Sequence, residues 1–335
     1  MFSAGYRAQP QDFEVTEELG FEPSGSGEHA LLYIEKLGAN TDWVARGLAR
    51  HADIKPVDVG YAGRKDRHAL TRQWFSVRTV NRTVDWSALE LDGVRVLEVN
   101  RHHRKLKRGA HKANAFRITL VDVSPVRFAD FLGRVDTVRA HGVPNYFGPQ
   151  RYGSRNLEQA ARLFAGGRLR RDQRSMALSA ARALIFNAIL DARVDAGLWD
   201  RLVPGDLANL DGSGSLFTVD AVDAELEDRL RRQDVHPAAS LWGRHRATRP
   251  TGEAESIEAV VLEEFDGFAR GLEGAGLDAS WRSCRVVPRS LTAMLVPGRI
   301  ELSFTLPAGA FATAVLREFG NVDDLSAAQS PSRST

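Results

Sequence analysis

The sequence predicts a protein that mixes α-helices and β-strands and is large enough for two domains. Three observations lead to this prediction. Segments within the first 123 residues alternate apolar and polar residues, which is typical of half-buried strands. Segments between residues 126 and 190 instead repeat apolar residues every three or four positions, as helices do. The length of 335 residues exceeds the usual size of a single hydrophobic core.

The first third of the chain is expected to be mainly β. Strands are predicted over Asp12–Leu19 and His29–Leu37, and a helix that begins at Asn40 or Thr41 follows them. Alternating apolar residues predict four further strands, over Val57–Tyr61, Gln73–Val77, Val94–Val99 and Ala115–Val123.

The rest of the chain is expected to be mainly helical until its last part. A helix over Val126–Ala140 should end at Gly142, because glycine readily adopts the conformation that closes a helix. Helical spacing continues over Leu157–Phe164, Ser179–Leu190 and Ala221–Arg232. Strand alternation returns over Arg299–Leu306, and a final helix runs through Phe311. The small polar residues 326–335 are expected to be disordered.

Composition narrows the functional classes. The hydrophobic content of 43% and charged content of 26% are ordinary for a soluble globular protein. Cys284 is the only cysteine, so no intramolecular disulfide can form, and no Cys/His cluster has zinc-finger spacing. The sequence has no run of 18 apolar residues and no basic-then-apolar N-terminal segment. We therefore expect a cytoplasmic protein that has no membrane partner.

The net charge of +2 hides an asymmetric distribution of charge. Residues 1–60 hold five Lys or Arg against ten Asp or Glu, whereas residues 61–112 hold thirteen against five. Residues 151–182 hold eight Arg against two acids. The densest block, Arg101–Lys112, carries six Lys or Arg, three His and no acid. Such blocks are typical of surfaces that bind a phosphate backbone, although a solvated basic loop without a partner would look the same.

One carboxylate stands among cationic residues in the segment Gly60-Tyr-Ala-Gly-Arg-Lys-Asp66-Arg-His-Ala-Leu-Thr-Arg-Gln73. Nearby cations favour the charged form of a carboxylate, so Asp66 is expected to be ionised. An ionised carboxylate in cationic surroundings suits nucleophilic attack on an electron-poor carbon of a polyanionic substrate. Taken alone, the segment favours a solvated, mixed-charge turn, because such turns are common.

Seven motifs in order carry a family resemblance. They are Asp12-Phe-Glu-Val-Thr-Glu17, Leu19–His29, Ala62–Gln73, Lys112-Ala-Asn-Ala-Phe116, Val143-Pro-Asn-Tyr-Phe-Gly-Pro-Gln-Arg-Tyr-Gly153, Ser179–Asn187 and Leu306-Pro-Ala-Gly-Ala-Phe-Ala-Thr313. Over nearly its whole length the chain resembles the TruD family of tRNA pseudouridine synthases. The resemblance implies an α+β fold: a pseudouridine-synthase catalytic domain with a mixed, bifurcated β-sheet, over residues 1–139 and 288–325. An inserted TRUD-type α/β domain would cover residues 140–287.

The same resemblance implies a function. Such proteins convert uridine 13 of tRNA into pseudouridine without a cofactor or metal, so tRNA is the expected partner and the chain is expected to act as a monomer. By its match to the family motif, Asp66 is the catalytic nucleophile. It could add to C6 of the uracil, attack C1′ of the sugar, or remove a proton from C2′. The sequence does not choose among these routes.

The resemblance also assigns residues to the substrate pocket. Phe13, Phe116 and Phe311 are expected to approach a flipped-out uridine, and Asn114 to form a hydrogen bond with it. Arg7 is expected to be the charged partner of Asp66. Each assignment has a simpler alternative. Phe13 and Phe116 lie on alternating strand faces that could simply fill a core, and Arg7 could be an exposed N-terminal charge.

Two other classes of function remain to be weighed. The first is an inactive tRNA-binding protein on the same scaffold, against which the intact Asp66 motif argues. The second is a nuclease or hydrolase that uses a carboxylate; such enzymes normally pair acids around a divalent metal. Asp66 has no acidic neighbour between Gly60 and Arg82. His102, His103 and His111 have no carboxylate or Cys at suitable spacing, so no metal site is expected.

Overall fold

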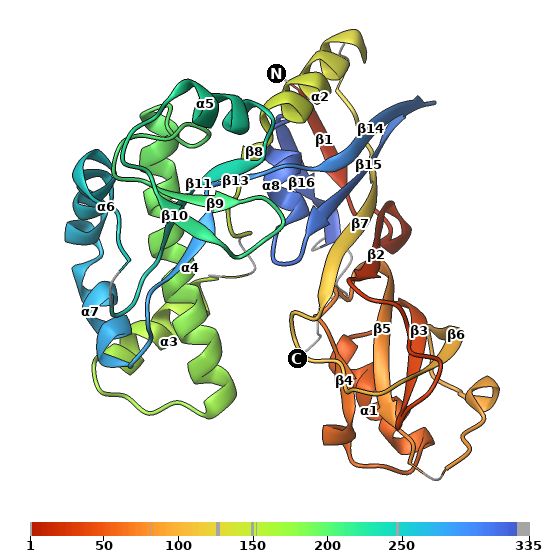
Figure 1. Cartoon of the computed structure of the whole chain (residues 1–335). Coiled ribbons are helices and arrows are strands. Elements are labelled where there is room, and N and C mark those ends of the chain that lie inside the picture. Colours follow the sequence, from red (N-terminus) through yellow and green to blue (C-terminus); the bar gives the residue numbers. More distant parts are fainter. Residues whose placement is uncertain are drawn as a thin grey trace, which may run out of the picture. The chain divides into compact units, whose positions relative to one another are not determined.

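The computed structural model describes residues 2–80, 82–124, 128–148, 151, 153–245 and 248–326. It divides into two compact units, each of which is described by itself (Figure 1). The first comprises residues 1–136, 288–309 and 319–335, and the second comprises residues 137–287 and 310–318. The helix α8 (Ala312–Arg317), which the sequence places in the catalytic domain, groups with the second unit. Residues 327–335 of the expected disordered tail lie outside the described residues.

The first unit is built on a mixed sheet of eight strands. Their order is β14-β15-β7-β2-β5-β3-β6, and β4 pairs with β5 off this path. The pair β2 and β5 is parallel, and the other neighbours are antiparallel. The strands are β2 (Phe13–Leu19), β3 (His29–Leu37), β4 (Val59–Tyr61), β5 (Leu70–Arg78), β6 (Val94–His102), β7 (His111–Leu120), β14 (Arg289–Val296) and β15 (Arg299–Pro307).

The sheet splits along β5, which gives it the bifurcated form that the sequence implied. Residues Leu70–Arg72 of β5 pair with β2. After a gap of two residues, Phe75 to Val77 pair with β4 instead. The other edge of β5 pairs with β3 over its whole length. The loop that joins β4 to β5, residues 62–69, therefore begins and ends beside the split.

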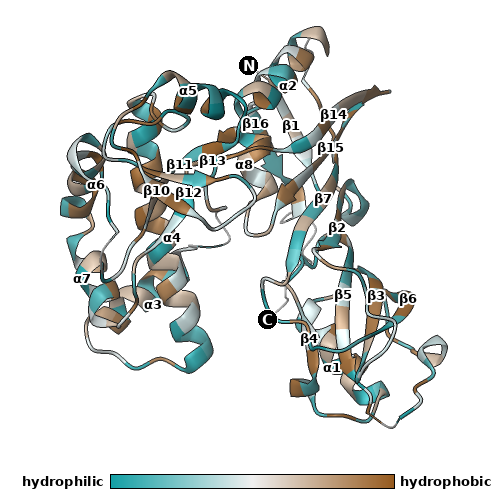
Figure 2. Cartoon of the chain, viewed as in Figure 1, coloured by the Kyte–Doolittle hydropathy of each residue, from teal (hydrophilic) through white to brown (hydrophobic). Residues whose placement is uncertain are grey.

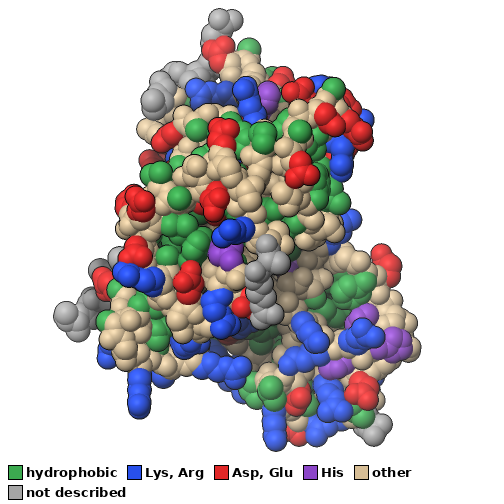
Figure 3. All heavy atoms as spheres, turned by 60° about the vertical axis from the view of Figure 1, so that its left-hand side comes forward, with side chains coloured by type: hydrophobic (Ala, Val, Ile, Leu, Met, Phe, Trp, Pro, Cys, Tyr) green, Lys and Arg blue, Asp and Glu red, His purple; other side chains and the backbone are tan. Residues whose placement is uncertain are grey.

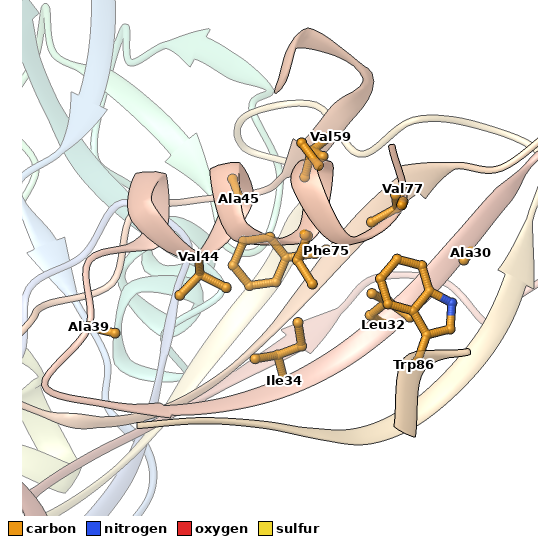
Figure 4. Packing of buried hydrophobic residues seen from close by; sticks show 13 residues of the cluster. Ala30, Leu32, Ile34, Ala39, Val44, Ala45, Val59, Phe75, Val77 and Trp86 are labelled. Atoms are coloured by element: carbon orange, nitrogen blue, oxygen red, sulfur yellow. The ribbon is translucent and has the colours of Figure 1, made fainter. Parts of the chain in front are cut away.

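Helix α1 (Thr41–His51) covers the part of the sheet formed by β3 and β5 (Figure 4). Its apolar residues recur at helical spacing, so Val44 and Leu48 face the sheet and are fully buried. They pack among Leu32, Ile34 and Phe75, which are also fully buried. Burying each such side chain contributes roughly 1.5–3 kcal/mol. Strand β3 contributes Ala30, Leu32 and Ile34 to this core, and part of its ribbon has the brown colour of hydrophobic residues in Figure 2.

The first and last strands of the first unit lie side by side, as expected if the chain returns to the domain in which it started. Strand β1 (Ser3–Tyr6) pairs in parallel with β16 (Asn321–Asp324). Helix α2 (Phe128–His141) begins beside them, and its Phe131 ring lies 5.0 Å from Phe2 and 4.9 Å from Phe319 between ring centroids. Three short 3-10 turns, Pro10–Asp12, Pro56–Asp58 and Trp86–Ala88, complete this unit among the described residues.

The second unit surrounds a long central helix, α4 (Arg171–Asp195), most of whose apolar residues are buried. Its other helices are α3 (Ser154–Phe164), α5 (Ala224–Arg231), α6 (Gly252–Glu264), α7 (Asp266–Gly274) and α8. Four antiparallel strands form a sheet in the order β10-β9-β11-β12, and β8 pairs with β13. These strands are β8 (Val143–Pro144), β9 (Leu207–Leu210), β10 (Leu216–Thr218), β11 (Val235–Leu241), β12 (Ser280–Ser283) and β13 (Arg285–Val286).

By length and composition alone, α4 could cross a membrane. More than half of its most apolar window is buried inside the protein, as in the core helix of a globular unit. One such helix is weak evidence for a membrane span.

Candidate active site

Asp66 lies in the β4–β5 loop at the split of the sheet. About a quarter of its side chain is exposed (24%), so a substrate can reach the carboxylate. The neighbouring side chains point elsewhere: Arg67 donates to the carbonyl of Gly38, and Lys65 turns into the protein. This alternation leaves Asp66 as the carboxylate that the loop presents.

The expected ionic partner of Asp66 is present. Arg7 Nη2 lies 2.9 Å from Asp66 Oδ2, and Arg7 Nη1 lies 2.9 Å from Asp324 Oδ2. The Arg7 side chain is buried, and its guanidinium carbon lies 4.0 Å from the centre of the Phe13 ring. The alternative of an exposed N-terminal charge is therefore wrong, and Arg7 holds two carboxylates at once.

Arg7 reaches this position through an unusual backbone conformation. Its φ of +61° lies in the left-handed region, which a residue with a Cβ seldom adopts. Such strain persists only where surrounding contacts enforce it, and it clusters at functional sites. Here the preceding residue, Tyr6, ends β1 and donates from its hydroxyl to Asp324 (3.2 Å). Burial raises the pKa of Tyr6, so its hydroxyl remains a neutral donor.

Buried polar side chains hold the backbone of the Asp66 loop by hydrogen bonds. Lys36 Nζ is fully buried and donates to the carbonyls of Asp66 (2.9 Å), Ala39 (2.8 Å) and Lys65 (3.4 Å). Thr41 Oγ1 accepts the Lys65 N–H (2.9 Å) and donates to Gln73 Oε1 (2.9 Å). Burial lowers the pKa of Lys36 to about 8, against the opposing pull of the Asp66 charge. The loop is therefore rigidly supported although it has no strand partner of its own.

Two of the predicted aromatic residues flank this group. The Phe13 ring packs edge-on against Phe116, with centroids 6.0 Å apart, and Phe116 stacks on Phe304 at 5.4 Å. Phe13 is buried, and one face of its ring contacts the guanidinium of Arg7. We infer that its role is to support the arginine. Phe116 is only partly buried. Of the two rings, Phe116 is the one that solvent, and hence a base, can reach.

Asn114 lies two residues before Phe116 on β7 and is buried. Its Oδ1 accepts a hydrogen bond from Lys65 Nζ, and its Nδ2 lies 3.2 Å from His111 Nε2. Lys65 Nζ also pairs with Glu17 at 2.9 Å. The predicted base-binding amide is thereby connected to the residue that precedes Asp66.

The densest basic segment lies against the Asp66 loop. Leu106 is buried, and its N–H donates to Ser76 Oγ (2.8 Å), while the N–H of Gly109 donates to the carbonyl of Ala62 (2.7 Å). The cationic side chains on both sides of Leu106 are exposed: Arg104, Lys105, Lys107 and Arg108. Figure 3 shows exposed Lys and Arg side chains gathered in patches. A polyanion bound to this segment would lie close to the loop that carries Asp66.

Phe311 belongs to the second unit, where it immediately precedes α8. Its ring meets Phe147 edge-on at 5.8 Å and is partly buried. Gly148 approaches the same ring closely, because a Cβ at that position would lie 3.2 Å from Phe311 Cδ1. The structure thus joins Asp66, Arg7, Phe13 and Phe116 in one unit by successive contacts, from Asp66 to Arg7, from Arg7 to Phe13 and from Phe13 to Phe116, and it places Phe311 in the other unit.

Several residues of the site were not predicted from the sequence. Asp324 stands 317 residues from Arg7 and lies in no recognisable motif, so no local signal identifies it. Lys36 occupies an alternating strand position, where a lysine normally indicates the solvent face. Glu17 and Lys65 stand inside motifs of the resemblance, so the signal for them was present and only their pairing was not.

No group of three or more His, Cys, Asp or Glu side chains within the described residues could hold a metal ion. Asp66 and Asp324 share the guanidinium of Arg7. A cation that bridged these carboxylates would have to displace this arginine. The carboxylates of Asp66 and Asp324 therefore suit the guanidinium of Arg7 as their fixed counterion.

A mixed, split sheet that presents an arginine-bound carboxylate beside a basic segment matches the pseudouridine-synthase catalytic domain that the sequence motifs implied. The family model for tRNA pseudouridine synthase D (TruD) matches residues 4–161 and 156–319. The chain is 48% identical to the tRNA pseudouridine synthase D of Methylococcus capsulatus, over 95% of this chain and 91% of that protein. It is 45% identical to that of Nitrosococcus oceani, over 93% and 89% respectively. The chain belongs to the TruD family.

A solved structure shares the fold. The crystal structure of a Methanosarcina mazei protein assigned as tRNA pseudouridine synthase D matches with a TM-score of 0.70. The match covers 95% of this chain and 93% of the other at 21% identity. The α+β class and the mixed sheet expected from the sequence are confirmed.

Proposed function

We propose that this chain converts uridine 13 of tRNA into pseudouridine and that Asp66 is its nucleophile. Membership of the TruD family supports an isomerase that acts on tRNA. The position within tRNA is implied by the family resemblance, and the role of Asp66 by its match to the family motif; both are proposals. We also expect the enzyme to act in the cytoplasm and as a monomer.

The observation that carries the proposal is the contact between Asp66 and Arg7. A partly exposed carboxylate is held by a buried guanidinium. The guanidinium is fixed in turn by Asp324 and by the face of Phe13. A reactive group held in one geometry by a rigid shell is what nucleophilic catalysis requires.

The chemistry needs no external reactant. The C1′–N1 bond of uridine breaks, the uracil turns, and C1′ bonds to C5; the C5 proton is lost and N1 gains a proton. The uracil must stay in the site between these steps. A carboxylate can add to C6, attack C1′ or remove the C2′ proton, and Asp66 is the proposed carboxylate in each route.

The target base must leave its stack in the RNA before it can reach Asp66. Extrusion costs a few kcal/mol, and stacking on a protein ring returns about 1–3 kcal/mol per base. The partly exposed Phe116 is the ring of the first unit that we expect to make this contact. Phe13 supports Arg7. Phe311 stays a predicted substrate contact, on the basis of its match to the family motif alone.

The direct test is Asp66→Asn. We expect pseudouridine formation in a tRNA transcript to be abolished, because an amide is a poor nucleophile, while tRNA affinity stays within a few-fold. The exposed Asp92 offers a matched control, since Asp92→Asn removes an acid of the same unit far from any motif. Turnover of the Asp66→Asn enzyme near that of the control would remove Asp66 as the nucleophile. Mapping the product within the transcript tests position 13.

The two alternatives predict different results. An inactive tRNA-binding protein would bind the transcript without changing it. A metal-dependent nuclease would lose activity in excess chelator, whereas we expect isomerisation to continue unchanged. Chelator sensitivity would contradict the proposed mechanism.

A further inference from the structure

A buried ion pair beside the nucleophile has no part in the chemistry described above. Lys65 Nζ and Glu17 Oε2 lie 2.9 Å apart; the Glu17 side chain is fully buried and that of Lys65 is 6% exposed. Burying two charges is costly unless further hydrogen bonds satisfy them. Glu17 and Lys65 each make such a hydrogen bond. The partners of these two bonds indicate what the ion pair does.

Glu17 anchors the pair at the split of the sheet. Its Oε1 accepts the N–H of Trp74 (3.1 Å). Trp74 stands on β5 between Arg72, where the pairing with β2 ends, and Phe75, where the pairing with β4 begins. A carboxylate thus replaces a strand partner at the point of divergence, and Lys65 is attached to this rigid point.

Lys65 fixes the orientation of Asn114. An ammonium can only donate hydrogen bonds, so the Asn114 atom that faces Lys65 Nζ must be the carbonyl oxygen. The amide nitrogen then faces the other way, toward His111 Nε2 at 3.2 Å. Burial and the nearby Lys65 charge lower the pKa of His111, which favours the neutral ring, whose Nε2 can accept. One N–H of Asn114 is used in this contact.

We propose that Lys65 is a positioning residue for uracil binding, because it turns Asn114 so that the amide offers an N–H donor to a carbonyl oxygen of the flipped uracil. The inference rests on the proposed function. With Lys65 removed, the amide could rotate by half a turn and present its oxygen, which would repel a uracil carbonyl. Uracil carries such oxygens at C2 and C4, and cytosine lacks the one at C4.

The test substitutes sulfur for each oxygen in turn, because sulfur is a weaker hydrogen-bond acceptor. Transcripts with uridine, 2-thiouridine or 4-thiouridine at the target position are compared by kcat/KM. For the wild-type enzyme we expect one of the two analogues to react about tenfold more slowly than uridine, the loss of roughly one hydrogen bond. For Lys65→Met this penalty should shrink to within about twofold. Each enzyme is its own reference, so the ratio does not depend on the folded fraction.

The exposed Lys55, in the same unit, provides the matched control. Lys55→Met should retain the full penalty. Because Lys65→Met leaves Glu17 buried without its partner, the double variant Glu17→Gln/Lys65→Met is measured in parallel and should show the same reduced penalty. A penalty unchanged in both Lys65 variants, or absent from the wild type at both oxygens, would overturn the inference.

A second variant tests the orientation of the Asn114 amide while the Lys65–Glu17 ion pair stays in place. Asn114→Asp keeps an oxygen toward Lys65 but has no N–H to offer, so we expect a melting temperature close to that of the wild type and a loss of turnover of about 100-fold or more. Near-normal turnover of this variant would also overturn the inference. The proposed function fails separately, if the wild type does not convert unmodified uridine.

Discussion

Arg7 links a strained backbone to a rigid site. A residue in the left-handed region normally relaxes unless its side chain is held, and here two carboxylates and an aromatic face hold it. The planar fork of a guanidinium can contact Asp66 and Asp324 together, whereas an ammonium is a single point charge. The position therefore depends on the shape of the cation as well as on its charge.

Arg7→Lys tests this dependence. The lysine keeps the charge but cannot hold both carboxylates in the same geometry. We expect the single-turnover rate to fall about tenfold, with tRNA affinity unchanged within about twofold, because small misplacement of a reacting group is costly. A rate equal to that of the wild type would show that charge alone suffices. Rapid-quench measurement of pseudouridine formation gives the single-turnover rate of each protein.

Lys36 gives the site a predictable dependence on pH. An unfolded lysine titrates near pKa ~10.4, and burial lowers the pKa of Lys36 to about 8. Between these values the unfolded chain binds more protons than the folded chain. The Lys36 contribution to the free energy of unfolding therefore rises with pH in this window, by about 1 kcal/mol per pH unit, and is constant below it.

Urea unfolding at about pH 8 and about pH 9.5 of the wild type and of Lys36→Met measures this contribution. The difference in free energy of unfolding between the two proteins should shift in favour of the wild type at the higher pH. Equal shifts in both proteins would show that Lys36 does not titrate in this range.

Strand β4 shows how one short element connects the split sheet to the basic segment. Gly60 is the middle residue of β4, and a Cβ there would lie 2.4 Å from the Leu106 carbonyl oxygen. Only glycine allows the two backbones to approach so closely. Together with the hydrogen bonds of Leu106 and Gly109, this fixes the segment Arg101–Lys112 beside the Asp66 loop.

Neutralising the exposed cations of that segment should weaken tRNA binding. We expect the change of Arg104, Lys105, Lys107 and Arg108 to Gln to lower affinity at low salt. The dependence of affinity on salt should also flatten, by about one unit of slope for each phosphate that the variant no longer neutralises. Arg231→Gln/Arg232→Gln, which alters exposed arginines already paired with Asp228, is the control. Filter binding across a salt series that gives the same slope for the wild type and the quadruple variant would show that the segment does not contact RNA.

The two ends of the first unit depend on one another. Strand β16 supplies Asp324 to Arg7 and pairs with β1, which positions Arg7. The active-site geometry is therefore completed only when the last part of the chain has returned to the first. Contacts of such long sequence separation are expected to form late in folding.

Truncation at Gly320 removes β16 and tests this dependence. We expect lower thermal stability and a loss of turnover of at least about tenfold, because Arg7 loses Asp324 and β1 loses its partner. Truncation after Ser326 keeps β16 and is the control. The thermal unfolding curve and the turnover of the shorter protein measure the effect, and wild-type turnover without β16 would contradict it.

The sequence predicted the elements well wherever the pattern is local. His29–Leu37 is a strand with the predicted bounds, and the helix predicted from Asn40 or Thr41 begins at Thr41. The segment Val57–Tyr61 was predicted as one strand, but Pro56–Asp58 forms a 3-10 turn before β4, because proline suits the first turn of a helix. Strands β11 and β14 and helices α6 and α7 were not predicted. Polar or small residues interrupt their patterns.

The amino-acid order alone determined the family and the candidate nucleophile Asp66, because short contiguous motifs carry them. It offered Arg7 as a candidate partner only through its place shortly before the motif that begins at Asp12. It could not reveal Asp324, the buried Lys36 or the pairing of Lys65 with Glu17. Those groups come from separate strands and meet only when the sheet splits and its ends close, so their charges are stabilised by neighbours that no local pattern specifies. The reactive residue is thus encoded locally, and the shell that holds it is a property of the tertiary fold.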